Sequence, residues 1–503
     1  MTDNRPTPSA LANSCETPSR RVFLAGAAAT GLAMAFPHRS RAQSPLKALA
    51  MPTMLDATET RRIALTAQPG ETAFVSAQTS ATAGFNGGYL GPVLRLPQGE
   101  TAISLENRLP MAVSAHWHGL AIPGEVDGGP HQPVEPGQTW SIALPVAQPP
   151  ATAWFHSHIH GETGSQVYSG LAGALQLTDG RDRERGLPTD YGIDDLMLVL
   201  QDKRFDDSGR FFYDPSMHDH MMGFLGNAIL VNGQAGSTAV VPETIVRLRL
   251  LNASNARIFN LSFASGRPLH LIATDGGYLP APQSIDRISL APGERAEVLV
   301  DFTAAQGDRL ISRDEANAMM GDGMMGSRAS SGPFDVLAFA TDQQMQGGID
   351  LLPDDLGGSR PQFDGSNAPR RQISLDMMVG GGMMGGIMRR LTGGDSHGIN
   401  GQTFDMGRID FEAKTGEVER WQITAPMMKH PFHVHGTRFQ VIAENGRAPQ
   451  VHNRGWKDTV LVDGSVDILV RFDRKAPQSA PYMYHCHILE HEDSGMMGQF
   501  TVA

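Results

Sequence analysis

Hydrophobic and polar residues alternate, or nearly alternate, in short runs along most of the chain. Three such runs are residues 103–106 (ISLE), 246–250 (VRLRL) and 468–472 (ILVRF), and Gly, Pro and Asn separate runs of this kind. A period of two is typical of β-strands, whereas the periodicity of an amphipathic helix is scarce here. The pattern therefore predicts an all-β protein built from antiparallel sandwiches.

The chain is too long for one hydrophobic core and contains weak internal sequence repeats. Its 503 residues suit about three domains. Residues 136–139 (PGQT) and 292–295 (PGER) each precede an alternating strand, and residues 171–175 and 498–502 each follow a histidine cluster as a final strand. The first and last thirds therefore look like copies of one module.

The N-terminal 42 residues are expected to be a twin-arginine signal peptide rather than part of the fold. Arg20 and Arg21 precede a short apolar run over 25–36, and Ser40-Arg41-Ala42 offers a peptidase site. Neither this run nor any later segment reaches the ~18 apolar residues of a membrane span. We expect export by the twin-arginine translocon to the periplasm and no membrane span. The alternative is a disordered N-terminus that contains two arginines.

Net charge and cysteine content limit the partners and the chemistry that we expect of the chain. The formal net charge is −12, and removal of the signal would make the chain more acidic. Nucleic acid is therefore not an expected partner, and we expect a monomer. Cys15 would leave with the signal, so Cys486 would be the remaining thiol. In an oxidising compartment a solitary thiol is best protected as a buried metal ligand.

Histidines recur in pairs separated by one residue. With 18 histidines, chance predicts about 0.6 such pairs, and the sequence contains six. Residues two apart share one face of a strand, so each pair would point both rings to the same side. Four pairs lie in contexts that indicate metal binding: His116 and His118, His156 and His158, His433 and His435, and His485 and His487.

The last pair encloses Cys486, which is followed by His491 and Met496. A thiolate, imidazoles and a thioether are the donors of a blue-copper site, in which two imidazoles and a thiolate form a plane and a weak Met ligand is axial. For a single Cys-x-His motif a buried structural cysteine would be the better interpretation. The excess of paired histidines favours metal.

With these motifs, residues 50 to 503 resemble the multicopper oxidases, especially the bacterial periplasmic copper efflux oxidases and laccases. The resemblance implies three cupredoxin-type Greek-key β-sandwich domains, which we place at 50–182, 190–345 and 365–503. It also implies four copper ions: one type 1, one type 2 and two type 3.

The resemblance assigns each ligand by position. It implies that His116 and His433 hold the type 2 copper. It gives one type 3 copper to His118, His156 and His487, and the other to His158, His435 and His485. It gives the type 1 copper to His430, Cys486 and His491, with Met496 as the axial ligand.

Two carboxylates match family positions that hydrogen-bond waters at the copper cluster. These are Asp127 and Glu492, and O2 reduction needs protons, so we expect both to be catalytic. The alternative is that they cap backbone N–H groups at strand ends. Trp456-Lys457-Asp458-Thr459 is expected to be structural support near the type 1 site. His160 is expected to be an outer-sphere or structural residue. His218 and His220 are expected to lie in a loop, with peripheral copper contact as the alternative.

The predicted activity couples one-electron oxidation of a reductant to the four-electron reduction of O2 to water. Cu(I) is the favoured substrate, with a role in copper tolerance, and small phenolic or aromatic reductants are the alternative. Non-enzymatic copper sequestration, or a structural role like that of the family's cell-division relatives, would not need the O2-reducing ligands.

Methionine-rich segments at 313–330 and 376–390 favour Cu(I) handling, since thioethers are soft ligands. A glycine-rich linker that tolerates methionine is the alternative. One departure weakens the Cu(I) prediction: Pro426 occupies the position of an acidic residue that helps the copper efflux oxidases bind Cu(I).

Overall fold

The computed structural model describes residues 47–75, 77–304, 307–313, 332–379 and 395–503. Strands dominate these ranges, and their α-helices are short: α1 (Thr163–Ser169), α2 (Met217–Met222) and α4 (Leu489–Glu492). Across the same ranges no helix is long and apolar enough to cross a membrane. The predicted signal peptide lies outside the described residues, as do residues 314–330 and 380–390 of the methionine-rich segments.

The first group of strands forms two four-stranded sheets. One has the order β1 (Met54–Asp56), β4 (Val93–Pro97), β8 (Ala172–Thr178), β7 (Ala151–His156). The other has the order β3 (Thr79–Phe85), β2 (Arg62–Ala73), β5 (Gly99–Asn107), β6 (Thr139–Val146). In β5 every second residue from Thr101 to Asn107 is buried, which is the alternation expected of a strand with one face on a core.

The second group also consists of two sheets. The six-stranded sheet has the order β10 (Ala228–Val231), β9 (Asp195–Lys203), β12 (Ile245–Asn252), β17 (Arg295–Asp301), β14 (Leu269–Thr274), β15 (Gly277–Ile285). The five-stranded sheet has the order β11 (Thr238–Pro242), β19 (Pro333–Asp342), β18 (Asp308–Arg313), β13 (Phe259–Phe263), β16 (Ile288–Leu290).

The third group is joined by two long strands, β23 (Val418–Val434) and β25 (Thr459–Arg471), which pair along most of their length. The path of strands is β21 (Gly398–Ile399), β20 (Arg370–Asp376), β23, β26 (Tyr482–Cys486), β27 (Met497–Val502), β22 (Phe411–Ala413), and β24 (Gln440–Glu444) pairs with β25. The register of β23 shifts between Ala425 and His430. Such bulges bend a strand and re-aim the side chains that follow, and His430 is the first paired residue after this one.

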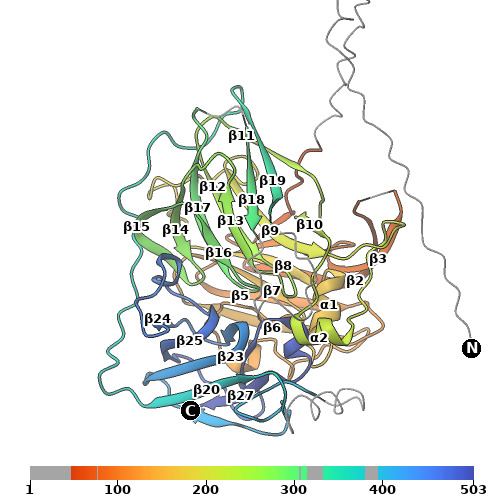
Figure 1. Ribbon diagram of the computed structural model, residues 1–503, viewed down its shortest axis with the longest axis vertical. Helices are drawn as coiled ribbons and strands as arrows, with labels where there is room; N and C mark the ends of the chain where they lie inside the picture. Colours follow the sequence, from red (N-terminus) through yellow and green to blue (C-terminus); the bar gives the residue numbers. More distant parts are fainter. Residues whose placement is uncertain (1–46, 76, 305–306, 314–331, 380–394) are drawn as a thin grey trace, which may run out of the picture. The chain divides into compact units, whose positions relative to one another are not determined.

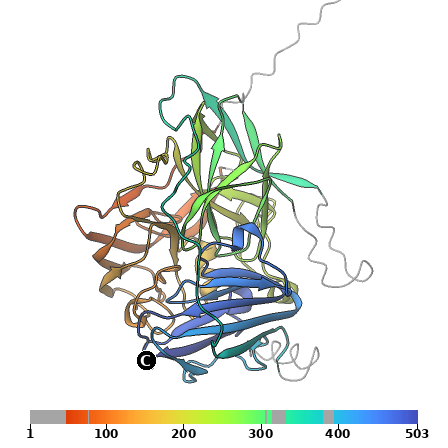
Figure 2. The same ribbon diagram turned by 90° about the vertical axis from the view of Figure 1, so that its left-hand side faces the viewer.

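The fold class is as predicted: an all-β protein with cupredoxin-type Greek-key sandwiches. Figures 1 and 2 separate the three groups by colour, from red and orange through green to blue. Each group of sheets falls within one of the three predicted ranges, although the exact domain boundaries stay a prediction.

A buried cluster at the junction of the groups draws on all of them. It contains Trp154 from β7, Met197 from β9, Leu251 from β12 and Leu489 from α4. The ring of Trp154 stacks on that of His156 at 4.3 Å between centroids. The shared core therefore adjoins the predicted copper ligands and holds strands distant in sequence in a fixed arrangement.

The alternating run in β12 is not a half-exposed strand. Arg247 and Arg249 are almost fully buried, like the leucines between them. Arg247 donates to Glu297 through Nε at 2.9 Å and to Asp182 through Nη1 at 2.9 Å, and Arg249 binds Asp195 through Nε at 2.7 Å. These ion pairs make burial of the polar face of β12 possible.

Candidate metal centres

Local strand pairing brings the four histidine pairs together two by two. His116 and His156 exchange backbone hydrogen bonds of 2.9 and 3.2 Å, which places the first pair beside the second. In the third group, His433 of β23 lies opposite His485 of β26, which places the third pair beside the fourth. Packing of the first group on the third then completes the cluster.

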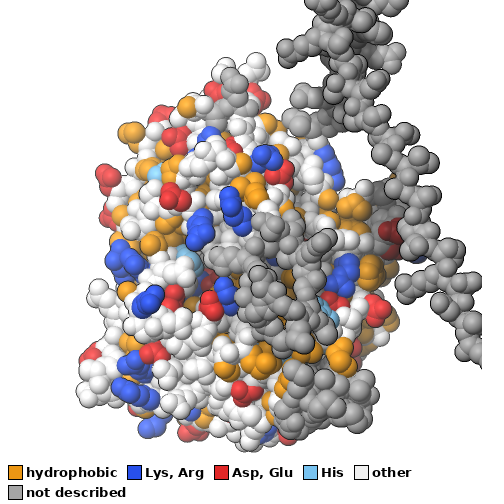
Figure 3. All heavy atoms as spheres, viewed as in Figure 1, with side chains coloured by type: hydrophobic (Ala, Val, Ile, Leu, Met, Phe, Trp, Pro, Cys, Tyr) orange, Lys and Arg blue, Asp and Glu red, His pale blue; other side chains and the backbone are white. Residues whose placement is uncertain are grey.

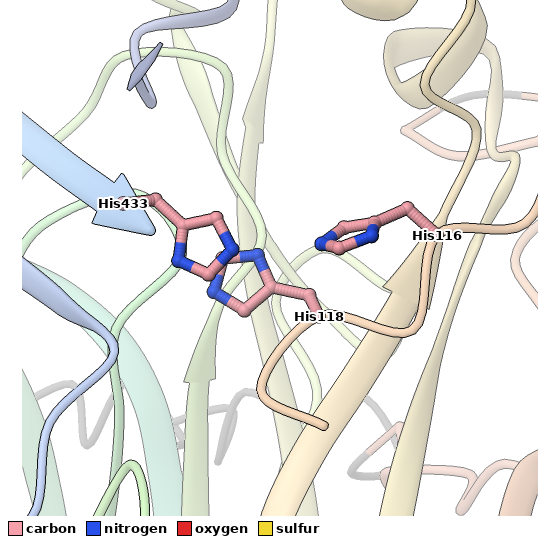
Figure 4. A group of neighbouring side chains, drawn as sticks. All are labelled: His116, His118 and His433. Carbon is pink, nitrogen blue, oxygen red and sulfur yellow. The ribbon is translucent and has the colours of Figure 1, made fainter. Parts of the chain in front are cut away.

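All eight paired histidines converge in one buried region. Three sets of ring nitrogens each lie within 4.8 Å of one another: His116, His118 and His433; His118, His156 and His487; and His158, His435 and His485. Figure 4 shows the rings of His118 and His433 stacked, with His116 facing them, and the stacked centroids are 3.6 Å apart. These sets contain every ligand assigned to the type 2 and type 3 coppers.

Backbone acceptors fix which nitrogen each ring can offer to a metal. Nδ1 of His116, His156 and His433 lies 3.1, 2.9 and 2.9 Å from the carbonyl oxygens of Asp127, Ser157 and Asp458. Because a carbonyl oxygen can only accept, Nδ1 carries the proton and Nε2 keeps its lone pair. Nε2 of all three rings is buried without a hydrogen-bond partner among the described residues, as expected of a metal ligand.

In His118 the roles of the two ring nitrogens are exchanged. Its Nε2 lies 3.1 Å from Oδ1 of Asp458, and its Nδ1 is buried and has no hydrogen-bond partner in the described part of the chain. Arg295 donates hydrogen bonds from Nη1 and Nη2 to Oδ1 and Oδ2 of Asp458, at 2.7 and 2.6 Å. His118 would therefore bind a metal through Nδ1.

The closest approach between rings of the histidine cluster suits a bound cation. Nδ1 of His435 faces Oδ2 of Asp127 at 2.7 Å, and Nδ1 of His485 faces the carbonyl oxygen of Cys486 at 3.0 Å. Both rings therefore carry a proton on Nδ1, and their Nε2 atoms lie 3.2 Å apart. A metal ion between these two nitrogens would bind both of them.

Burial keeps six imidazoles of the cluster neutral. Desolvation, followed by repulsion from the neighbouring rings, holds the pKa of His118, His158, His433, His435 and His487 well below its ordinary value. For His156 the pKa is also lowered, chiefly by burial. Neutral imidazole is the form that binds metals, so the site is ready for them at neutral pH.

Cys486 belongs to a separate set of three donors. Its Sγ lies 3.3 Å from Nδ1 of His430 and 3.7 Å from Nδ1 of His491, and the two nitrogens are 3.2 Å apart. Nε2 of His491 faces the carbonyl oxygen of Met221 at 3.2 Å, which leaves Nδ1 of His491 as the free donor. Two imidazoles and a thiol in this arrangement fit the plane of a type 1 copper site.

The surroundings of this second centre are apolar. Burial raises the pKa of the Cys486 thiol and lowers the pKa of His430 to about 3, so a bound cation is required to hold the thiolate. Met496 is fully buried, and its carbonyl oxygen accepts from the backbone N–H of Cys486 at 3.1 Å. Its place beside the donors fits an axial ligand, which stays a proposal.

The two predicted catalytic carboxylates lie beside ligand rings. Oδ2 of Asp127 accepts from Nδ1 of His435 and is 3.4 Å from Nδ1 of His116. Oε1 and Oε2 of Glu492 lie 3.3 and 3.1 Å from Nδ1 of His158 and His485, yet neither oxygen accepts a hydrogen bond from a described group. Neither side chain caps a described backbone N–H group.

One structural prediction was wrong. The Trp456 to Thr459 segment was expected to support the type 1 site, but Asp458 and Thr459 contact His118 and His433 of the other cluster instead. The reason is that Thr459 of β25 pairs with His433 of β23.

The sequence analysis missed a further histidine beside the Cys486 centre. His397 is buried and its ring stacks on that of His491 at 4.7 Å between centroids. A histidine outside the paired motifs carries no sequence signal for this place.

The remaining histidine motifs lie outside the four donor sets. His160 is exposed, and its ring contacts Phe404 at 5.0 Å between centroids. His218 and His220 lie on α2, a helix where a loop was expected.

The chain belongs to the multicopper oxidase family. Three sequence models of that family, each described as multicopper oxidase, match residues 66–182, 188–324 and 371–503. This confirms the family predicted from the histidine motifs. Membership implies copper as the metal, and the donor sets above suit it.

Individual relatives point to different roles. The laccase-like multicopper oxidase CueO of the lignin-degrading bacterium Ochrobactrum sp., with oxidase activity toward lignin model compounds and lignosulfonate, is 41% identical, with a TM-score of 0.83 over 90% of this chain and 100% of that one. A multicopper oxidase of Campylobacter jejuni, described as a metallo-oxidase, is 27% identical, with a TM-score of 0.76 over 91% and 98%. The cell division protein FtsP of Sodalis glossinidius is 37% identical over 96% of this chain and 98% of its own.

Proposed function

We propose that this chain is an oxidase that couples one-electron oxidation of a reductant to the reduction of O2 to water. The supporting observation is the convergence of eight buried histidines on one region, where Nε2 of His435 and Nε2 of His485 lie 3.2 Å apart. A purely structural role would not need three adjoining sets of ligand nitrogens. Cu(I) is the favoured reductant, in copper tolerance, and phenols are the alternative.

Four coppers are proposed, held as the sequence assigned them. His116 and His433 would hold the type 2 ion, and the two triads completed by His487 and His485 would hold the type 3 pair. His430, Cys486 and His491, with Met496, would hold the type 1 ion. When bound, the type 1 copper accepts electrons singly, and the other three copper ions supply the site where O2 is reduced.

The protein's own groups supply orientation and protons. Asp127 fixes the ring of His435, and the Asp458–Arg295 pair fixes that of His118. Glu492, buried beside two ligand rings without a hydrogen bond from any described residue, is a proposed proton donor, and Asp127 is the other. Cys486 and His485 are adjacent in β26, so one peptide links the two centres.

Metal content and oxygen uptake test this function. We expect four coppers per copper-loaded chain. Oxygen uptake on Cu(I) should consume one O2 per four Cu(I). His158→Ala should abolish uptake, whereas His160→Ala, two residues away and exposed, should leave metal content and uptake unchanged. A chain without O2 uptake on Cu(I) or a phenol would contradict the proposal.

The relationship to FtsP supports a second candidate, a role in cell division without redox chemistry. A variant with His435→Ala and His485→Ala separates the two. In a strain that lacks the protein, this variant should fail to restore copper tolerance. If it restored normal division as well as the wild-type chain does, the cell-division role would be favoured.

We also propose export to the periplasm by the twin-arginine route. Replacing Arg20 and Arg21 with lysine tests this, because it removes both arginines of the motif.

A further inference from the structure

The ring of His397 lies flat against a ligand of the proposed type 1 centre. Its centroid is 4.7 Å from that of His491, and the two ring planes differ by 16°. His397 is 1% exposed and His491 is fully buried. On the face of the molecule that Figure 3 presents, histidine covers only small areas, as expected when the metal-site histidines lie inside. The stacked pair is therefore shielded from solvent.

The backbone around His397 is fixed to the turn that follows His491. The N–H groups of Ser396 and His397 both donate to the carbonyl oxygen of Ser494, at 3.1 and 3.0 Å. A Cβ added to Gly495, which has a φ of +98°, would lie 2.9 Å from the carbonyl oxygen of His397, so the two segments touch there. The distance between the two rings is therefore set by direct contacts between their backbones.

The ring of His491 is restrained on one edge and on one face. Its Nε2 donates to the carbonyl oxygen of Met221 at 3.2 Å, and His397 covers one face. The ring of His397 is itself oriented, because its Nδ1 lies 3.0 Å from the hydroxyl oxygen of Ser396. Rotation of the His491 ring about its Cβ–Cγ bond would break the hydrogen bond and drive the ring into His397. The plane of the imidazole directs the lone pair of its Nδ1, so this restraint fixes where a metal can bind.

His397 also lies near the other imidazole ligand. The pKa of His430 is lowered to about 3, first by burial and then by electrostatic repulsion from His397. The predicted ligand set of the type 1 centre does not include His397, and the donor set of His430, Cys486 and His491 is complete without it. Its place beside two ligands therefore calls for a role other than ligation.

We propose that His397 is a positioning residue of the type 1 centre, whose stacked ring fixes the plane of His491, keeps water from that ring and so holds the reduction potential of the bound ion high. The inference rests on the proposed oxidase function and deepens it, since it names what regulates electron entry. A copper ion bound by a thiolate has one positive charge less after it accepts an electron from the reductant. Dry surroundings of low dielectric constant therefore favour its reduced form.

The competing interpretation is that His397 only fills space in the core of the third group. Two substitutions separate the ring from its other properties. His397→Phe keeps a flat ring of similar size but loses the hydrogen bond to Ser396, whereas His397→Gln keeps a hydrogen-bonding group but has no ring. His397→Ala removes both and opens one face of His491.

The test is an anaerobic redox titration of the visible band of the copper-loaded protein. At a fixed applied potential, His397→Ala should lower the ratio of reduced to oxidised type 1 copper about tenfold, which for a one-electron couple is a shift of about 59 mV. His397→Gln should shift the ratio in the same direction, and it fills more of the space if the alanine variant is unstable. His397→Phe should stay near wild type. The type 1 signal in electron paramagnetic resonance should change in the alanine and glutamine variants and be kept by phenylalanine.

Phe404→Ala is the matched control for loss of packing. Phe404 is 6% exposed, its N–H donates to the carbonyl oxygen of Gly495 at 3.1 Å, and its ring belongs to a buried cluster with Met483 and Met497. This variant should lose stability in urea unfolding but keep the wild-type potential. Wild-type potentials in both His397→Ala and His397→Gln would overturn the inference. An equal shift in Phe404→Ala would overturn it as well, because general loosening would then be the cause.

Failure of the inference and failure of the oxidase function are distinguishable, because the redox titration needs no O2. If blue wild-type protein took up no O2 with Cu(I) or a phenol, the oxidase function would fail, while the titration would still decide the role of His397. A wild-type chain that bound no type 1 copper would overturn both.

Discussion

Oδ2 of Asp127, in the first group of strands, accepts a hydrogen bond of 2.7 Å from Nδ1 of His435 in the third. The bond spans 308 residues of sequence and is fully buried. It holds the proton of His435 on Nδ1 and directs the lone pair of Nε2 into the histidine cluster. Asp127 therefore orients a ligand and is a positioning residue as well as a proposed proton donor.

Replacement of Asp127 separates these two roles. Asp127→Asn keeps an acceptor oxygen for Nδ1 of His435 but cannot release a proton, so we expect near-normal copper content and O2 reduction slowed by about 10- to 100-fold. Asp127→Ala should in addition lose copper, because the ring is no longer oriented. Copper per chain and the rate of reoxidation by O2 measure both effects. Full activity of Asp127→Asn would remove Asp127 from proton transfer.

Cys486→Ser should abolish the intense visible absorption of the copper-loaded protein, because that band requires a copper–thiolate bond. Oxidation of any reductant should stop as well, while copper at the histidine cluster stays bound. Absorption and electron paramagnetic resonance spectra check this. A variant that stayed blue would show that Cys486 is not a type 1 ligand.

Met496→Leu should keep the colour but raise the reduction potential of the type 1 copper. Met496 is fully buried, and leucine has a similar volume, so the plane of His430, Cys486 and His491 should be preserved. Loss of a weak electron donor favours the reduced ion. Redox titration of the visible band gives the potential, and an unchanged or lower value would argue against axial ligation.

The local patterns of the sequence were sufficient for the strands and, through the paired histidines, for the family. The resemblance to that family then assigned the four donor sets, including His433 and His435, and the structure brings the members of each set together. Outer partner groups distant in sequence could not be assigned. Asp458 meets His118 across 340 residues, and nothing in either motif indicates the contact.

The sequence also did not predict which charged side chains are buried. The run VRLRL in β12 has the alternation of a half-exposed strand, yet Arg247 and Arg249 are buried because Glu297, Asp182 and Asp195 arrive from other strands and loops. The hydrogen bond that His491 donates to Met221 of α2 depends likewise on packing of the second group on the third. Such relations depend on the assembled tertiary structure.

The buried arginine pair leads to a prediction about stability. Arg247→Met removes a buried cation and leaves Glu297 and Asp182 partly uncompensated, so we expect the free energy of unfolding to fall by about 3 to 5 kcal/mol. Arg309→Met is the control, because Arg309 pairs with Asp335 at 2.8 Å at the surface and should cost less than about 1 kcal/mol. Urea unfolding of the copper-free variants gives both values. Equal effects would show that the β12 network adds nothing beyond a surface pair.

Glu492→Gln tests the proton donor most directly. Its two oxygens lie 3.3 and 3.1 Å from Nδ1 of His158 and His485 and accept no hydrogen bond from a described group, so the carboxyl group is available to exchange a proton. The amide keeps the shape but supplies no proton, so O2 reduction should slow by about a hundredfold. Copper content and the rate of type 1 reduction should stay near those of wild type.

Glu490→Gln is the matched control, two residues away and equally buried. The oxygens of Glu490 are occupied by the N–H of Phe224 at 2.9 Å and by Asn255 at 2.8 Å, so this residue is held as a structural acceptor. We expect it to change stability but not the rate of reoxidation. Stopped-flow mixing of each reduced variant with O2 measures that rate. If Glu492→Gln reoxidised as fast as wild type, the protons would have to come by another route, and Asp127 would be the next carboxylate to test.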